Sequence, residues 1–226
     1  MRKLITIRRG SNSRRVRPGL ICVAGPYWAN PERGPSGGYS LLELVFVMAL
    51  SITVSAAAVP QYLSGLDDTR ATAATRYVAA RLQRARMDAV TRSASVAIQF
   101  SSFSTGYAFG VYADGNRNGV LTYDIQHGVD RPLGAVEHLS DQFPGVDFGV
   151  LPGLPAIDSG SSPPGSDPIH LGSGSLASFS PAGTSSSGTL YLRSRGGAQF
   201  AIRIFGETGR TRSLKFDRNS WVWRPL

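Results

Sequence analysis

The sequence has almost no cysteine. Cys22 is the only one among 226 residues, and it lies in the N-terminal segment. A single thiol forms no intramolecular disulfide and no thiolate metal site, so stability must come from a hydrophobic core. Cys22 follows Gly19-Leu20-Ile21 rather than a small residue, which argues against a lipid anchor at this position.

Side chains for catalysis are also scarce. The three histidines, His127, His138 and His170, lie in polar or turn-rich sequence without a metal-ligand spacing. No strand-to-helix G-x-S-x-G places a nucleophilic serine, and no glycine-rich phosphate loop follows a strand. We therefore expect a protein that is not an enzyme and has no cofactor and no catalytic residue. A signal-anchored periplasmic enzyme is the third class, if catalytic groups converge in a pocket.

Acidic residues are nearly absent from the first part of the chain. Residues 1–38 contain eight basic residues and one acid, Glu32, whereas residues 39–226 contain 16 basic and 14 acidic residues. The formal charge of +9 therefore comes mostly from the leader. Residues 93–192 contain two basic and eight acidic residues, whereas residues 193–226 contain eight basic and two acidic residues. The chain thus has an acidic middle and a basic end.

One long stretch, Leu41 to Val59, contains no charged residue except Glu43. Its length of about 28 Å as a helix nearly matches a hydrocarbon core of ~30 Å. The basic segment before it predicts a cytoplasmic N-terminal side, with everything after Pro60 outside. A secretory signal cut near Ala56–Ala58 is the alternative, although the apolar run is longer than a typical signal core.

Glu43 is the unexpected residue in this stretch. A carboxylate inside a span costs a few kcal/mol and is by default a functional hypothesis with a partner to be found. Cleavage after Gly38 would give Tyr39 a new α-ammonium group four residues before Glu43, one helical turn away or available to a neighbouring helix. A glutamate near a helix end can also extend its carboxylate to the membrane interface.

Gly38, then Tyr39-Ser40-Leu41-Leu42-Glu43, then an apolar helix, resembles the class III signal of type IV pilins and pseudopilins. Pro60 falls at the twenty-second position after the cut. The resemblance implies that a prepilin peptidase cleaves between Gly38 and Tyr39 and methylates the new amine, and that Glu43 helps to dock the subunit into a filament. Tyr39 stands where the family usually has phenylalanine, and the leader is long.

After Pro60 the apolar residues predict an amphipathic helix to about Arg92, because they recur at three- and four-residue spacing: Ala71, Ala74, Val78, Leu82, Ala85 and Ala89. This alanine-rich stripe suits close packing on a sheet. Short β-rich segments follow, at Ser95–Phe100, Tyr107–Ala113, Leu176–Ser180, Thr189–Arg193, Gln199–Phe205 and Thr211–Phe216.

These patterns predict an α+β fold, in which a long N-terminal hydrophobic helix packs through its C-terminal half on a mainly antiparallel β-sheet domain. The expected parts are a basic leader at 1–38, a helix at 39–92 with a transmembrane segment at 41–59, and a β-rich domain at 93–226. Much of the Gly/Ser/Pro-rich insertion at about 143–188 is expected to be a mobile surface excursion.

The sequence resembles the GspH/FimT family of minor pseudopilins over most of residues 39–216. The resemblance lies in four features that follow one another along the chain: the N-terminal helix, "ARMDAVTRSASVAIQF", "FSPAGTSSSGTLYL" and a late "GRTR". The resemblance implies an assembly subunit of a type II secretion pseudopilus or a type IV pilus, acting in secretion or pilus assembly. It implies a single pass through the bacterial inner membrane, with the C-terminal domain in the periplasm. The implied partners are the prepilin peptidase, other pilin or pseudopilin subunits, and secreted cargo or DNA.

Asp114, Asn116 and Asn118, followed by Gly119, match the first places of a calcium loop. The twelfth place, however, is Ile125 rather than a bidentate glutamate. A hairpin turn explains the same asparagines and glycines. We therefore expect no metal site here.

The basic end contains the second candidate motif. Gly209-Arg210-Thr211-Arg212 matches a Gly-Arg-x-Arg pattern that the FimT-type branch uses in DNA uptake. Arg210, Arg212 and Lys215 would contact phosphates, with Trp221 and Trp223 nearby for stacking. A FimT-type DNA-binding minor pilin is therefore the alternative function. Arginines on exposed strand edges also keep sheets soluble, which needs no ligand.

Overall fold

The computed structural model describes residues 38–104, 106–158, 160–172 and 174–226. Of the leader expected at 1–38, only Gly38 is among them, and Cys22 is outside. The chain divides into two compact units, residues 1–48 and residues 49–226.

Helix α1 (Leu41–Arg92) is the longest element, with 52 residues. Its first turn closes when the Leu44 N–H donates to the Ser40 carbonyl at 3.0 Å. Pro60 lies inside the helix without ending it. The predicted stripe is confirmed, because the buried residues of α1 are Ala71, Ala74, Thr75, Val78, Leu82, Ala85 and Ala89.

Two antiparallel sheets form the rest of the domain. The first contains, in order, β3 (Arg131–Pro132), β2 (Gly106–Ala113), β1 (Val96–Phe103) and β7 (Leu176–Phe179), with β4 (Glu137–His138) also on β2. The second contains β11 (Val222–Pro225), β10 (Arg210–Asp217), β9 (Gln199–Phe205), β8 (Gly188–Ser194) and β5 (Val146–Phe148), with β6 (Ile169–Leu171) also on β8. Two short helices, α2 (Thr122–Gln126) and α3 (Leu139–Gln142), lie in the connections.

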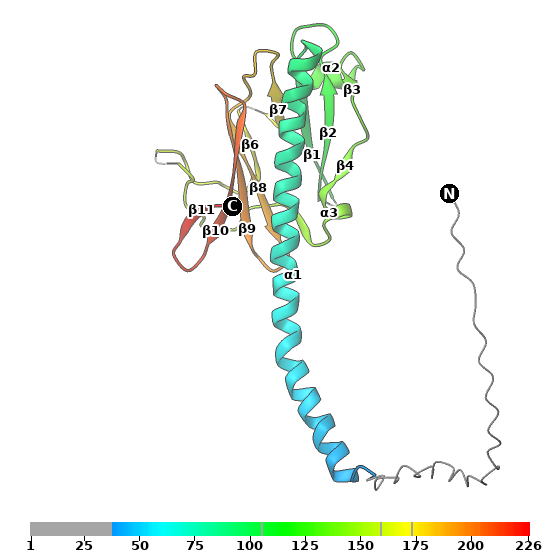
Figure 1. Cartoon of the computed structure of the whole chain (residues 1–226). Coiled ribbons are helices and arrows are strands. Elements are labelled where there is room, and N and C mark those ends of the chain that lie inside the picture. The colour runs from blue at the N-terminus through cyan, green and yellow to red at the C-terminus, as the bar shows by residue number, and fades with distance from the viewer. Residues whose placement is uncertain (1–37, 105, 159, 173) are drawn as a thin grey trace, which may run out of the picture. The chain divides into compact units, whose positions relative to one another are not determined.

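The main core lies where α1 packs against both sheets. Figure 1 shows the C-terminal half of α1 running alongside them. The alanines of its stripe let the helix approach closely, and one cluster joins them to large residues of the sheets, including Phe100, Phe179, Leu190, Phe200 and Ile202. The α+β architecture predicted from the sequence is confirmed, and all six predicted strands are present.

The insertion at about 143–188 contains the predicted strand at Leu176–Ser180, as β7, and also the strands β5 and β6. The segment after β5 covers the outer face of the second sheet. There Val150 and Ile157 pack against a small cluster with Tyr191, Ala201, Leu214 and Trp223. The buried apolar residues of this segment are isolated among prolines and glycines, so their pattern has no periodicity to reveal the packing.

Gln199 connects this segment to the sheet through its side-chain amide. Its Nε2 donates to the Gly149 carbonyl at 3.0 Å, and its Oε1 accepts from the Leu151 N–H at 3.0 Å. The side chain is 1% exposed. Buried amides are costly unless they are hydrogen-bonded, so this arrangement fixes the start of the segment on β9.

Candidate functional site

The residues of the expected processing signal lie together at the start of α1. Tyr39 is 85% exposed, and a Cβ added to Gly38 would meet no atom within 4 Å. Within the described part of the chain, no atom near Gly38 would exclude a larger side chain by contact.

Glu43 lies in the first turn of α1. Its carboxylate has no hydrogen-bond or ion-pair partner within the described part of the chain. A negative charge in the first turn is favourable to the helix dipole, typically by 0.3–1 kcal/mol. The geometry thus tolerates Glu43 locally and leaves its carboxylate available to another molecule.

Within the described residues, α1 is the one helix long and apolar enough to cross a membrane, judged by length and composition. Its large apolar side chains before Pro60 are mostly more than half exposed, including Leu44, Phe46 and Ile52. An apolar surface of this size needs lipid or neighbouring helices to cover it.

The tetrapeptide at 209–212 begins at the turn between β9 and β10. Gly209 is buried there with φ of +60°. A Cβ added to it would lie 2.7 Å from the Gly183 carbonyl oxygen and 2.9 Å from Nε of Arg86. The glycine of the tetrapeptide is therefore required by the turn itself, whatever the arginines do.

Arg210 and Arg212 are exposed on the outer face of the second sheet. Neither guanidinium has a hydrogen-bond or ion-pair partner among the described residues. Arg212 lies directly opposite Arg203 of β9, whose Nε is 2.8 Å from a carboxylate oxygen of Asp158. Two unpaired arginines thus lie next to one that is already neutralised.

Thr211 and Lys215 project from the other face of β10. The Thr211 hydroxyl accepts from Nε2 of Gln83 on α1 at 3.0 Å, and Nζ of Lys215 is 2.6 Å from an oxygen of Asp68. Side chains alternate between faces along a strand. The structure therefore brings Arg210 and Arg212 together but places Lys215 away from them, paired with the helix.

Hydrogen bonds close the loop that resembles a calcium site. Oδ1 of Asp114 accepts from the Arg117 N–H at 2.7 Å, and its Oδ2 accepts from the Gly119 N–H at 2.8 Å. The side-chain amides of Asn116 and Asn118 donate to Oδ2 of Asp124 at 3.2 and 3.0 Å. The side chains of the weak calcium candidate, Asp114, Asn116 and Asn118, thus already have hydrogen-bond partners in this region.

Two further carboxylates in this loop were not singled out from the sequence. Asp124 and Asp130 are 7% and 1% exposed, and Asp130 accepts from the Gly115 and Leu121 N–H groups at 3.0 Å each. Their position just after the loop is the only sequence signal. In the described part of the chain, no group of three or more His, Cys, Asp or Glu residues is arranged to hold a metal ion.

The three histidines lie apart from one another. His127 stacks on Tyr123 with ring centroids 4.0 Å apart, and His138 is 3.9 Å from Asp141. His170 lines a polar depression with Asp167, but the Oδ1 of Asp167 accepts from the Ile169 N–H. Among the described residues, no hydrogen bond joins a histidine to a carboxylate and a serine in the manner of a catalytic triad.

Burial perturbs two groups near this depression. It raises the pKa of Tyr107 and the pKa of Asp147 above their ordinary values. Hydrogen bonds from Phe148 and Tyr107 partly oppose the shift at Asp147. The carboxylate joins β5 to β2 through its contact with the Tyr107 N–H at 3.3 Å, so a structural role accounts for it.

The sequence model of one family, described as type II transport protein GspH, matches residues 74–209. This match covers more than half of the chain. The chain belongs to the GspH family. The comparison with curated proteins found no match, and neither did the comparison with solved structures.

The GspH family is a family of structural pseudopilins rather than of enzymes. Membership and the apolar helix together indicate a membrane-anchored pseudopilin that associates with other pilin or pseudopilin subunits. The matched region begins at Ala74 within α1 and ends at Gly209. Gly38, Glu43, Arg210 and Arg212 lie outside it, so their roles depend on sequence and geometry alone.

Proposed function

We propose that this chain is a minor pseudopilin, an assembly subunit of a type II secretion pseudopilus, with a type IV pilus as the other possible filament. A prepilin peptidase cleaves between Gly38 and Tyr39 and methylates Tyr39, and residues 41–59 anchor the product in the bacterial inner membrane. The β-rich domain is in the periplasm. The observation that carries this proposal is the position of Gly38 and Tyr39 immediately before α1 and of Glu43 in its first turn, on a helix whose C-terminal half packs in the core of a domain that matches the GspH family.

Glu43 acts in assembly through its charge. In a filament the apolar half of α1 packs among neighbouring helices, where the low dielectric strengthens attraction between opposite charges. The methylated ammonium group of Tyr39 on an adjacent subunit is the natural partner for an unpaired carboxylate. The β domain remains outside this helical bundle and contacts other minor subunits or secreted cargo.

Mass analysis of the N-terminus tests the processing step. Protein extracted from membranes should begin with N-methylated Tyr39. A chain that begins at Val59 would instead show cleavage by signal peptidase and would end the pseudopilin proposal.

Substitution of Glu43 tests the assembly step. Glu43→Val should leave processing and membrane insertion largely intact but prevent recovery of the subunit in sheared filament fractions, because it removes the counter-charge. Ser55→Val is a matched control, since it adds apolar surface to the same helix without removing a charge. Equal recovery of Glu43→Val and wild-type protein in filaments would contradict the proposed role.

DNA binding is the second candidate, and the exposed, unpaired Arg210 and Arg212 favour it. Bound phosphates release counterions, so genuine binding should weaken steeply as salt rises. A gel-shift titration at two salt concentrations would compare wild type with the double variant Arg210→Ala/Arg212→Ala. The control is Arg117→Ala/Arg131→Ala, two exposed arginines of another region. We expect weak or absent binding; tight, salt-sensitive binding lost only in the first double variant would make DNA uptake the leading function.

A further inference from the structure

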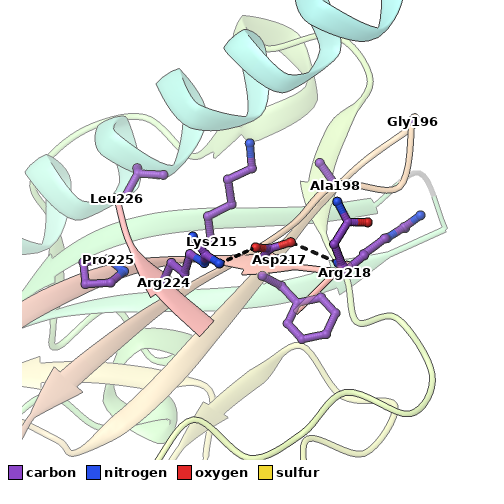
Figure 2. A pocket seen from close by; sticks show the side chains of 10 residues that line it. Gly196, Ala198, Lys215, Asp217, Arg218, Arg224, Pro225 and Leu226 are labelled. Atoms are coloured by element: carbon purple, nitrogen blue, oxygen red, sulfur yellow. Dashed lines mark hydrogen bonds and ion pairs between the residues drawn. The ribbon is translucent and has the colours of Figure 1, made fainter. Parts of the chain in front are cut away.

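A depression of about 560 Å³ lies between the turn from β8 to β9 and the hairpin of β10 and β11. Figure 2 shows Lys215, Arg218 and Arg224 around it, together with Asp217. Gly196 and Ala198 form its border on the β8–β9 side. The lining thus contains three cations and one carboxylate.

The positive charge is only partly neutralised. Arg224 is 3.0 Å from Oδ2 of Asp217, and Lys215 is paired with Asp68. The guanidinium of Arg218 donates to the Gly197 carbonyl, which carries no net charge. Arg195, next to Gly196, is exposed, and its guanidinium has no partner in the part of the chain that the structure describes. Asp67 on α1, which also lies beside Gly196, is 3.8 Å from Arg70. The charges of Arg218 and Arg195 therefore remain as the positive excess at the depression.

Contacts with α1 place this depression close to the end of the apolar segment. A Cβ added to Gly196 would lie 3.1 Å from Oδ2 of Asp67, so the β8–β9 turn is level with Asp67 on the helix. Asp67 is only eight residues after Val59, a rise of about 12 Å along a helix. The polar headgroup layer extends ~5–8 Å beyond the hydrocarbon core, which leaves the depression within about one Debye length of the headgroups.

An exposed tryptophan, Trp221, lies on the turn between β10 and β11. Trp221 is 57% exposed and has φ of +56°, an uncommon value for a residue other than glycine. Its ring meets Phe216 edge-on at 5.2 Å, so the indole has a supported position at the surface. Tryptophan is enriched where proteins meet the membrane interface, and basic residues there attract anionic lipid.

We propose that this depression binds the phosphate headgroup of an anionic phospholipid in the membrane that anchors α1, with Arg218 and Arg224 as the phosphate ligands and Trp221 in the interface. This site depends on the membrane anchor proposed above. The contact holds the β domain against the membrane before assembly and breaks when the subunit enters a filament. Free phosphate has the same chemistry, but only the bilayer also receives Trp221.

The test uses the full chain, with Trp28→Phe in every sample, reconstituted into vesicles that contain a lipid with a nitroxide on its headgroup. One set of vesicles is phosphatidylcholine and the other also contains phosphatidylglycerol. The difference between protein with and without Trp221→Phe gives the fluorescence of Trp221. We expect the nitroxide to quench Trp221 in the phosphatidylglycerol vesicles and much less in phosphatidylcholine alone.

Arg218→Gln/Arg224→Gln should lower the ratio of quenched to unquenched Trp221 by about 10- to 30-fold, because each cation near an anionic surface contributes to binding. The matched control, Arg210→Gln/Arg212→Gln, makes the same charge change at the other end of β10 and should leave the ratio unchanged. Circular dichroism would establish that both variants are folded. Trp221→Ser is a second test variant. It should weaken the binding of phosphatidylglycerol to the protein without removing a charge.

Flotation of the vesicles separates this inference from the proposed function. Protein that does not float with vesicles lacks the membrane anchor, and both proposals fall. Protein that floats but shows no quenching of Trp221, or equal quenching in the Arg218/Arg224 variant, overturns only the headgroup site. An equal change in Trp221 fluorescence on adding inorganic phosphate to phosphatidylcholine vesicles would also overturn it, because the site would then bind anions without the lipid.

Discussion

We expect a large loss of folding stability when Gly209, in the turn between β9 and β10, is replaced by alanine. In Gly209→Ala, the new methyl group would lie 2.7 Å from the Gly183 carbonyl oxygen and 2.9 Å from Nε of Arg86. The first of these neighbours is backbone, so the two turns must separate or Gly209 must change its φ of +60°. Both adjustments disturb the end of the sheet from which Arg210 and Arg212 project.

The cost has two parts. A left-handed conformation costs alanine roughly 1–2 kcal/mol, offset by about 0.4–1 kcal/mol because alanine restricts the unfolded chain. Overpacking against backbone adds about 1–3 kcal/mol. We therefore expect Gly209→Ala to lower the free energy of unfolding by about 1–4.5 kcal/mol. At ~2–4 °C per kcal/mol for a domain of this size, the melting temperature should fall by roughly 2–18 °C.

Thermal unfolding of detergent-solubilised protein, followed by circular dichroism, would measure this fall beside two controls. Gly172→Ala has nearly the same φ, +56°, but open space around the new methyl group, so it should lose only the conformational part. Gly134→Ala has neither a positive φ nor a close neighbour and should be nearly neutral. Equal losses in Gly209→Ala and Gly172→Ala would refute the steric argument, and a neutral Gly209→Ala would refute the turn geometry.

Three further predictions concern the β domain. Gln199→Ala should lower the free energy of unfolding by about 2–4 kcal/mol, because it leaves buried backbone groups unpaired. Limited proteolysis should then cut near residues 149–158. Unchanged protease resistance would argue that Gln199 does not hold this segment on β9. Calcium should barely move the melting temperature, since Asp114 and Asp124 are already hydrogen-bonded; a shift of several degrees would show a site. Because burial raises the pKa of Asp147, its ionisation destabilises the fold, so Asp147→Asn should gain stability relative to wild type as the pH rises from about 3 to about 7; a constant difference in denaturant melts would contradict this.

The periodicities within single stretches of the sequence were sufficient to predict the main elements. The alanine stripe of α1 repeats every three or four residues over more than four helical turns, and each of the six predicted strands has enough β-branched and aromatic residues to be recognised. These signals are local, so they survive without knowledge of the tertiary structure. The Gly38 to Glu43 pattern is local in the same sense, although no contact within the chain tests it.

The remaining features depend on contacts between segments far apart in the sequence. The two-residue strands β3 and β4 are too short to show alternation, and they form only because β2 provides an edge for both. Val150 and Ile157 reach the outer face of the second sheet across a stretch with the composition of a loop. The pairing of Asp158 with Arg203 had no local signal, because the strands β6, β7 and β8 separate the two residues in the chain.

The fold divides the basic residues at the end of the chain, although composition alone groups them together. Residues 193–226 contain eight basic residues and two acids, which alone favours a single phosphate-binding surface. Strand β10 separates the basic residues into two groups instead. Seven residues at a rise of about 3.3 Å each place Arg210 and Asp217 about 23 Å apart, at opposite ends of the strand. Arg203 and Lys215 between them are neutralised by Asp158 and Asp68.

Two separate basic surfaces remain, and they face different surroundings. Arg210 and Arg212 lie at the end of the sheet near Arg86, late in α1, whereas Arg218 and Arg224 lie near the level of Asp67, just after the apolar segment. The first pair therefore lies toward the C-terminal end of α1, and the second pair lies toward its apolar segment. The two pairs carry the same charge, so the two double variants differ only in the position of the charges removed. A nucleic acid bound through the excess charge of the whole tail would lose affinity in both double variants. If the sheet divides the tail into two separate surfaces, each double variant should weaken only the binding of the ligand at its own surface.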